Sequence, residues 1–523
     1  MPKNDPQNSM PQIISRHGAH ATRGLDDVPR STLYEGRFGR IFRTLPPFRP
    51  KVPNDDFVLL TSTMLELQND EAPGEDSRDN VKISSGFTYL GQFIDHDLTF
   101  DPNSKLQREN DPNALRNFRT PRFDLDNIYG NGPDDNPFLY DARPENRGKL
   151  LIGKNDFGED DQPRNAQETA LVGDPRNDEN LIISQLQLVF LKFHNKVMDD
   201  LAASGADSEA IFEEARRVVR WHYQWIVLHE FLRRIVGGDV INDVLQPDSY
   251  KVHTAGGLKT ANLWKGNLKF YDWKNQPYIP VEFSVAAYRF GHSMVRSNYA
   301  INIFTDPNDG NEELQIFSND PNKDLRGFRK RPKEREIEWH YFFEFKKNDE
   351  DLQHSRKIDT KLAFGLGSLP FIPKPLNALA RRNLKRGIAL ALPSGQAVAQ
   401  AMGLPDDLIL EPNFNNAKRT DDTGDNYVNL TADEMNTLRT NYSAETPLWY
   451  YILHEAETLC DGLKLGPVGG RIVAEVFIGI LLGDNFSFLN AAPAWKPTKG
   501  EFGCRKAGEY TVIDLLKYVG AKE

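Results

Sequence analysis

The sequence predicts a mainly α-helical protein with little β-structure, and two kinds of segment support that fold class. Apolar residues recur at helical spacing in several segments, most strongly at 180–203 and 208–236. Long stretches rich in Asn, Asp, Pro and Gly separate these segments, as is typical of loops. We therefore expect an extended amino-terminal arm over residues 1–79, one large helical domain over about 80–490, and a carboxy-terminal tail over 491–523 packed on that domain.

The composition supports a sizeable core and argues against two classes of partner. The chain has 523 residues, of which 39% are hydrophobic and 11% aromatic, so we do not expect a disordered protein. Its net charge of −11 and pI near 5.6 argue against nucleic-acid binding and against a basic membrane-binding face. Two cysteines, Cys460 and Cys504, cannot build a disulfide framework, and we expect both to be free and buried.

The sequence contains no segment that we interpret as a signal peptide or a membrane span. The first residues are polar and lack an apolar run, and the most apolar stretch, 476–482, is too short to cross a bilayer. We expect a soluble protein that is cytoplasmic or exported by a non-classical route.

The remaining segments are expected in the following order. A short helix is predicted near 59–67, and further helices at 86–100, 283–297, 376–402 and 447–482. Residues 237–281 form a connector in which strand and turn cannot be separated. Residues 305–358 are so rich in charge that we expect a solvated surface excursion.

The segment 86–101 is the most informative in the chain. Its apolar residues recur at helical spacing, which predicts a largely buried helix: Phe87, Leu90, Phe93, Ile94 and Leu98. The middle of the same helix is polar, with Gln92, Asp95, His96 and Asp97. At about 100° per residue, Gln92 and His96 lie on one line, whereas Asp95 and Asp97 point about 200° apart. Since buried charge is costly unless it is paired or bound to a metal, this helix is predicted to serve a functional site.

Four other polar segments each have an ordinary structural explanation when taken alone. Thr120–Asp126 reads as a solvated acidic turn, although its oxygens suit calcium. Gly173–Asn180 reads as a capped helix start with Asp174 near the N-cap. Tyr288–Met294 contains a histidine after a glycine, which suggests a flat group close to the backbone. Ala380–Gly387 places an asparagine in a basic helix.

Taken together and in this order, the segments resemble the animal-type haem peroxidases of the peroxidase–cyclooxygenase superfamily, and most closely its shorter bacterial members. The resemblance covers about residues 80–490. Its most specific part is the motif Gly91–Asp97, and Gly466–Arg471 is similar to the carboxy-terminal helix motif of the family. The resemblance implies a helical haem peroxidase domain that holds haem b between a distal helix near 86–100 and a proximal helix near 283–297.

The resemblance implies a role for each candidate site residue. His96 would be the distal histidine and Arg176 the distal arginine, with Gln92 lining the distal pocket. His292 would ligate the haem iron, with Asn383 accepting its other ring N–H and Arg289 beside the cofactor. Asp95 and Glu179 match the carboxylates that form ester links to haem. The calcium ligands would be Asp97, Thr120, Arg122 (through its carbonyl), Asp124 and Asp126.

The implied reaction uses hydrogen peroxide to oxidise small anions, such as bromide, iodide and thiocyanate, or phenolic donors. Where some members have a methionine linked to haem, this chain has Asn180, which disfavours chloride oxidation.

Two alternatives to the peroxidase remain. A fatty-acid dioxygenase would need a tyrosine three residues before the proximal histidine, where this chain has Arg289 with Tyr288 one residue away. A non-catalytic haem- or calcium-binding interaction protein would need neither His96 nor Arg176. The other histidines that we considered are interpreted as structural: His194, His222, His229, His340 and His454.

Overall fold

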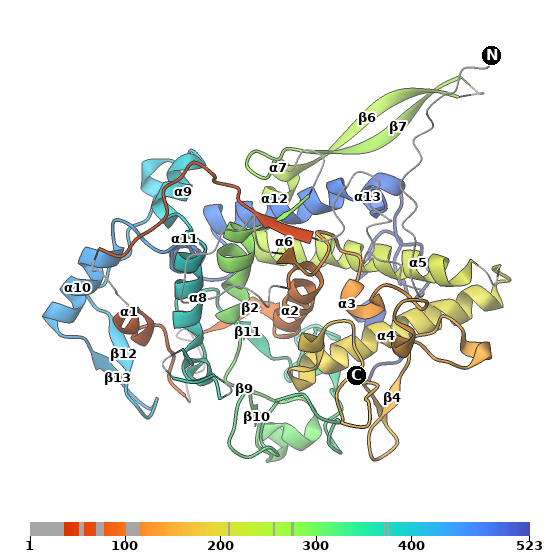
Figure 1. Cartoon of the computed structure of the whole chain (residues 1–523), viewed down its shortest axis with the longest axis horizontal. Helices are drawn as coiled ribbons and strands as arrows, with labels where there is room; N and C mark the ends of the chain where they lie inside the picture. Colours follow the sequence, from red (N-terminus) through yellow and green to blue (C-terminus); the bar gives the residue numbers. More distant parts are fainter. Residues whose placement is uncertain are drawn as a thin grey trace.

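The computed structural model describes residues 36–51, 57–68, 78–100, 116–207, 210–254, 257–272, 277–370, 372–374 and 376–523. The fold is mainly helical, as the sequence predicts, with several small sheets at its periphery (Figure 1). Most of the predicted amino-terminal arm lies outside the described residues. Its described part contributes strand β1 (Gly36–Gly39) and the short helix α1 (Val58–Ser62).

Helix α2 (Gly86–Leu98) lies in the middle of the molecule (Figure 1). All five apolar residues that predicted it are buried, because other elements pack around the helix. The ring of Phe93 stacks on Phe190 of α4 (Leu181–Ala203) with ring centroids 4.6 Å apart. The helix ends where Thr99 becomes extended.

The segment predicted as one helix at 208–236 is continuous but not uniform. It comprises α5 (Ile211–Ile226), a π-helical turn at Val227–Phe231, and α6 (Leu232–Val236). Asn180, the N-cap of α4, accepts hydrogen bonds from the backbone N–H groups of Ile182 and Ile183.

Two helices predicted as single are each divided in two. The segment 376–402 forms α8 (Leu379–Ala389) and α9 (Gly395–Ala401), and 447–482 forms α11 (Leu448–Cys460) and α12 (Pro467–Gly483). The physical reason is the same in both. Ala391 and Asp461 have positive φ, and a proline follows each within six residues, so neither helix can continue.

The segment 283–297, predicted as one helix, is helical only as far as residue 292 and is not a regular α-helix. A π-helical turn, Glu282–Ala286, is followed by a 3₁₀ helix, Ala287–His292, which ends at the histidine. Ala286 has φ −126° and ψ −74°, outside the helical region, so the hydrogen-bond pattern changes there. The short 3₁₀ helix is packed against α11, where the indole Nε1 of Trp449 donates to the carbonyl of Arg289 at 3.2 Å.

The prediction of a solvated excursion over 305–358 was wrong. Leu325, Ile337, Trp339, Phe342 and Phe343 from this segment are all buried. They alternate with charged residues, so the average charge concealed an apolar face. The backbone N–H that begins α2 donates to the carbonyl of Phe342, so this segment contacts the central helix directly.

The β-structure consists of short pairs and one long hairpin. Strands β6 (Leu245–Thr254) and β7 (Gly257–Gly266) extend away from the body in Figure 1, beyond helix α7 (Gly238–Val244). One three-stranded sheet has the order β3 (Arg116–Asn117), β1, β8 (Ile279–Pro280). The other two-stranded pairs are β2 (Asp79–Ser84) with β11 (His354–Arg356), β4 (Gly153–Lys154) with β5 (Asp160–Asp161), β9 (Asn298–Tyr299) with β10 (Leu314–Gln315), and β12 (Lys418–Thr420) with β13 (Tyr427–Asn429).

The remaining helices are α3 (Asp126–Tyr129), which is buried beside α2, α10 (Ala432–Tyr442), α13 (Phe488–Ala491) and α14 (Val512–Val519). Cys460 and Cys504 are free, as expected, but only Cys504 is buried. Within the described residues, no helix combines the length and apolar character that crossing a bilayer requires.

The packing of α2 yields a stability prediction. Replacing Phe93 by alanine removes a fully buried ring between Phe190 and Tyr223, and should lower the free energy of unfolding by about 3–5 kcal/mol. The matched control is Phe138→Ala at a half-exposed site, which should change it by less than about 1 kcal/mol. Denaturant unfolding followed by circular dichroism measures both, and equal effects would contradict a core dependent on this stack.

Candidate active site

The residues predicted to form the distal part of the site do come together. His96 and Gln92 lie on one face of α2, and the side chain of Glu179 approaches this face. Nε2 of His96 is 3.9 Å from Oε1 of Glu179, and the side-chain amide of Gln92 donates to the same oxygen. Asn180 donates from Nδ2 to Oε1 of Gln92 at 3.3 Å, so it contacts the group predicted to line the pocket.

Arg176 is brought to these residues by a 3₁₀ turn, Pro175–Asp178. Asp174 caps this turn, as the sequence suggested, by accepting the backbone N–H of Arg176 at 2.8 Å. Its carboxylate also accepts from Nε and Nη2 of the Arg176 side chain, at 3.1 and 2.9 Å. With three residues per turn, Arg176 and Glu179 lie on the same side, as their spacing predicted.

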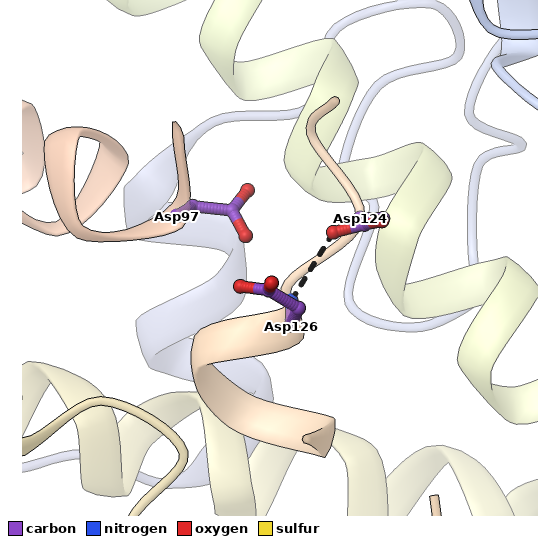
Figure 2. A group of neighbouring side chains, drawn as sticks. All are labelled: Asp97, Asp124 and Asp126. Atoms are coloured by element: carbon purple, nitrogen blue, oxygen red, sulfur yellow. Dashed lines mark hydrogen bonds between the residues drawn. The ribbon is translucent and has the colours of Figure 1, made fainter. Parts of the chain in front are cut away.

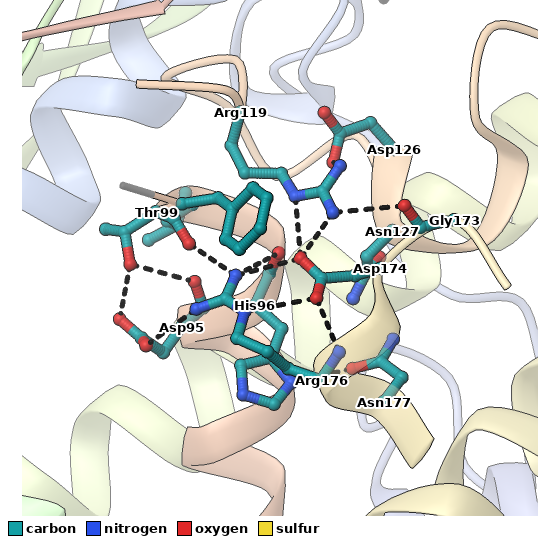
Figure 3. A network of polar contacts seen from close by, with 12 residues as sticks. Asp95, His96, Thr99, Arg119, Asp126, Asn127, Gly173, Asp174, Arg176 and Asn177 are labelled. Atoms are coloured by element: carbon teal, nitrogen blue, oxygen red, sulfur yellow. Dashed lines mark hydrogen bonds and ion pairs between the residues drawn. The ribbon is translucent and has the colours of Figure 1, made fainter. Parts of the chain in front are cut away.

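Asp95 completes the distal group from the other side of α2. Its Oδ2 lies 3.6 Å from Nη1 of Arg176, and its Oδ1 accepts from the hydroxyl of Thr99 at 2.8 Å. The guanidinium of Arg176 also lies over the ring of Phe100, 4.9 Å from its centroid. Figure 3 shows Asp95, Arg176 and Asp174 in one chain of polar contacts above the ring of His96. Arg176 is therefore held from three sides.

Burial sets the protonation of the distal groups. Burial, and then the nearby Arg176 cation, lower the pKa of His96 to about 3, so its ring is neutral at physiological pH. Burial raises the pKa of Glu179 to about 7, although Arg176 opposes the shift. A neutral imidazole beside a fixed guanidinium can accept a proton while the cation stabilises developing negative charge.

The residues predicted for the proximal part also meet. The side-chain amide of Asn383, from α8, lies 2.8 Å from Nδ1 of His292, and Nη1 of Arg289 donates to Oδ1 of Asn383 at 3.4 Å. In this arrangement the amide nitrogen faces the ring, whereas the sequence argument expected the amide oxygen there. Burial, and then Arg386, lower the pKa of Arg289 to about 10.

A cavity of about 170 Å³ is lined by residues from both the distal and the proximal group. Asp95 and Arg176 line it from the distal side, and Arg289 and Arg386 line it as well. Gly291, directly before His292, faces open space, because a Cβ added there would meet no atom within 4 Å. The absence of a side chain at Gly291 therefore leaves room for a ligand close to the backbone beside His292, as the sequence suggested.

A second cluster lies behind α2, on the side opposite Asp95. Asp97, Asp124 and Asp126 are all buried, and each offers an oxygen within 4.8 Å of the others (Figure 2). Burial and the neighbouring Asp124 raise the pKa of Asp97, and neither of its oxygens accepts a hydrogen bond of normal geometry. The hydroxyl of Thr120 donates to Asp124 at 2.7 Å, and the Arg122 guanidinium lies 4.0 Å from Asp124. Three carboxylates packed together in this way suit a cation.

Two residues of the site were missed from the sequence. Arg119 is buried and contacts both Asp126, at 3.3 Å, and Asp174, where its Nε donates at 3.0 Å. Asn177 lies 2.7 Å from Nδ1 of His96. Neither contact across the site has a signal in the sequence, because Asp174 is 55 residues from Arg119 and His96 is 81 residues from Asn177.

Two of the histidines interpreted as structural, His194 and His222, have polar partners in the packed interior. His194 contacts the Tyr129 hydroxyl and the Gly148 carbonyl, and Nδ1 of His222 lies 2.7 Å from the carbonyl of Val218.

Comparisons with known proteins find relatives among the peroxidases. A sequence profile of the animal haem peroxidase family matches residues 106–327. The chain is 26% identical to a chorion peroxidase of Aedes aegypti over 41% of this chain and 24% of that protein. It is 32% identical to a chorion peroxidase of Drosophila melanogaster over 30% and 19%, and 23% identical to heme peroxidase 2 of Caenorhabditis elegans over 80% and 61%. The chain thus spans about a quarter or less of the two chorion peroxidases.

Solved structures share the fold over nearly the whole chain. Peroxidase A of Dictyostelium discoideum superposes with a TM-score of 0.58 at 17% identity, covering 94% of this chain and 93% of that one. A fatty acid alpha-dioxygenase of Oryza sativa superposes with a TM-score of 0.54 at 16% identity, covering 97% and 84%. The matching profile and the peroxidase relatives show that this chain is similar to the animal haem peroxidase family, most clearly over residues 106–327, and the solved structures show that it shares their fold.

Proposed function

We propose that this protein is a haem peroxidase that uses hydrogen peroxide to oxidise small anions or phenolic one-electron donors. The observation that carries the proposal is the distal pair. A buried, neutral His96 and a fixed Arg176 lie side by side, and Arg176 lines the cavity that Arg289 also lines, three residues before His292. Binding haem alone would require neither member of that pair.

Haem, when bound, supplies a redox-active iron that takes up the two oxidising equivalents of hydrogen peroxide. His292 would hold the iron, since open space lies beside Gly291 and the ring is neutral because burial lowers its pKa to about 3. Ligation through Nε2 leaves a proton on Nδ1, so the Asn383 amide would turn its oxygen toward the ring. Arg289 and Arg386 would face the carboxylates of the cofactor.

The proton steps follow from the distal residues. The unprotonated nitrogen of His96 would accept a proton from the peroxide oxygen that faces the haem iron. It would return this proton to the other peroxide oxygen, which leaves as water. Arg176 stabilises the negative charge that develops as the O–O bond breaks, and its three fixed contacts mean that it needs no reorganisation. Gln92, on the same face of α2 as His96, donates to Glu179 and accepts from Asn180.

The cation on the distal side of the cavity favours small anionic substrates. Arg176 lines that side together with Asp95, whereas Arg289 and Arg386 would face the carboxylates of the cofactor. Bromide, iodide and thiocyanate are therefore the first substrates to test, with phenols as the alternative donors. A fatty-acid dioxygenase is not favoured. Tyr288, the tyrosine nearest to His292 in sequence, donates its hydroxyl to the carbonyl of Gly91 at 3.1 Å.

We also propose that the acidic cluster binds calcium. Asp97, Asp124 and Asp126 supply carboxylates, and Thr120 with the carbonyl of Arg122 would supply neutral oxygens. A bound cation would remove the repulsion that now raises the pKa of Asp97.

The last proposal is covalent attachment of haem through Asp95 and Glu179. Both carboxylates belong to the distal group, and Asp95 lines the cavity. Each ester would join a carboxylate oxygen to a haem methyl carbon, with peroxide turnover as the oxidant.

The function is tested with haem-reconstituted protein and hydrogen peroxide. The Soret band should change within one turnover, and bromide or a phenol should restore the resting spectrum. His96→Ala should keep haem but slow the first spectral change by about 10²–10⁴-fold, since it removes the base. His292→Ala should not hold haem stably, and His340→Ala, a histidine outside the site, is the matched control. A wild-type spectrum that ignores peroxide would refute the proposal and direct the test to fatty acids.

Calcium removal should destabilise the protein. Chelation should lower the melting temperature by several degrees, because three buried carboxylates then repel one another, and added calcium should restore it. Asp97→Asn should abolish the calcium response, whereas Asp248→Asn on the exposed hairpin should leave it intact. A melting temperature that is indifferent to calcium in the wild type would contradict the site.

Covalent attachment should appear on extraction with acidified acetone after several peroxide turnovers. We expect most haem to stay with the wild-type chain, because an ester bond survives the solvent. The single variants Asp95→Asn and Glu179→Gln should each lose one link, and the double variant should release all its haem. Complete extraction from the wild type after turnover would refute the esters.

A further inference from the structure

Asn177 and Gln187 form a buried pair of amides behind the distal histidine. Oδ1 of Asn177 lies 2.7 Å from Nδ1 of His96, and Nδ2 of Asn177 donates to Oε1 of Gln187, also at 2.7 Å. Asn177 is 0% exposed, Gln187 1% and His96 3%, so water does not compete for these contacts. Figure 3 shows the side chain of Asn177 beside the ring of His96.

The three side chains come from three separate elements. His96 is on α2, Asn177 lies in the 3₁₀ turn that carries Arg176, and Gln187 is in the second turn of α4. The backbone N–H of Asn177 also donates to the carbonyl of Asp174 at 3.0 Å, which fixes the turn itself. The contact with His96 is therefore built by the tertiary fold.

The orientation of the Asn177 amide has a chemical consequence. Because its NH₂ group is used by Gln187, it presents its oxygen to the imidazole. An oxygen can only accept, so Nδ1 of His96 must carry the ring proton. Nε2 is then unprotonated, and it is the nitrogen that lies 3.9 Å from Glu179. The opposite tautomer would put a proton on the very nitrogen that must act as a base.

We propose that Asn177, oriented by Gln187, is a positioning residue that fixes the tautomer and ring orientation of His96, so that Nε2 is the nitrogen that accepts the proton of hydrogen peroxide. This inference deepens the proposed function and rests on it for its catalytic meaning. The tautomer itself can be tested without any turnover.

The first measurement is ¹⁵N NMR of the full-length chain labelled with ¹⁵N at histidine, in the haem-free state. The His96 signals are identified by their loss in His96→Gln. The wild type should show a protonated Nδ1 and an unprotonated Nε2 at pH 7. Asn177→Leu should remove that preference and give a mixture or the opposite tautomer. A protonated Nε2 in the wild type, or an unchanged tautomer in Asn177→Leu, would overturn the proposal.

The second measurement follows the peroxide-dependent Soret change in the haem-loaded protein by stopped flow. Asn177→Leu should slow this step roughly 10- to 100-fold, a part of what a positioned general base contributes. Gln187→Leu removes the acceptor for the Asn177 NH₂ group and should slow the same step, by less than Asn177→Leu does. The matched control is Gln185→Leu, another buried amide of α4, whose contacts are with the backbone of Arg335 and Ile337.

Carbon monoxide binding to the reduced haem needs no proton transfer and separates positioning from collapse of the pocket. It should be unchanged in Asn177→Leu if the variant affects only the base. Equal slowing of carbon monoxide and peroxide, or equal slowing in Gln185→Leu, would overturn the positioning role. If the wild type does not react with peroxide, the proposed function fails, and the NMR result still decides the tautomer.

Discussion

The buried guanidinium of Arg119 connects the two charged parts of the site. It lies 3.3 Å from Asp126 of the acidic cluster and donates to Asp174, the residue that caps and holds Arg176 (Figure 3). Burial alone would lower the pKa of Arg119, but these carboxylates raise it above its usual value. Breaking a buried pair by removing one partner costs about 3–5 kcal/mol, because the other charge is left uncompensated. Arg119 therefore holds the acidic cluster and the turn that carries Arg176 in fixed positions relative to each other.

Helix α2 makes the same connection through its geometry. Successive side chains rotate by about 100°, so His96 faces the turn of Arg176 and Asn177 while Asp97 faces the acidic cluster. A shift of α2 that moved one of them would move the other. A cation at Asp97 would thus stabilise the position of the proposed catalytic base without touching it. The stack of Phe93 on Phe190 holds the helix against α4, which also supplies Gln187.

The proximal part of the site, which carries His292, depends on irregular backbone. The π-helical turn at 282–286 and the 3₁₀ helix at 287–292 replace the α-helix that the apolar pattern suggested. Such departures are frequent at functional sites because they re-aim side chains. Here they turn Tyr288 toward the carbonyl of Gly91 and leave open space beside Gly291. The hydroxyl of Tyr288 is thus used in a contact between the proximal segment and α2, which agrees with a peroxidase more than with a dioxygenase.

The sequence by itself determined the mainly helical class, the central helix with its polar middle, and most members of the three groups of side chains. These features are local, since helical spacing and a short motif are properties of neighbouring residues. Charge density misled the prediction over 305–358, because burial depends on which face of a segment the rest of the chain covers. Only the tertiary structure decided the roles of Arg119, Asn177 and Gln187. Arg119 contacts Asp174 and Asn177 contacts His96, both far away in the chain, while Gln187 contacts Asn177 from the following helix. The direction of such hydrogen bonds is fixed by packing rather than by spacing.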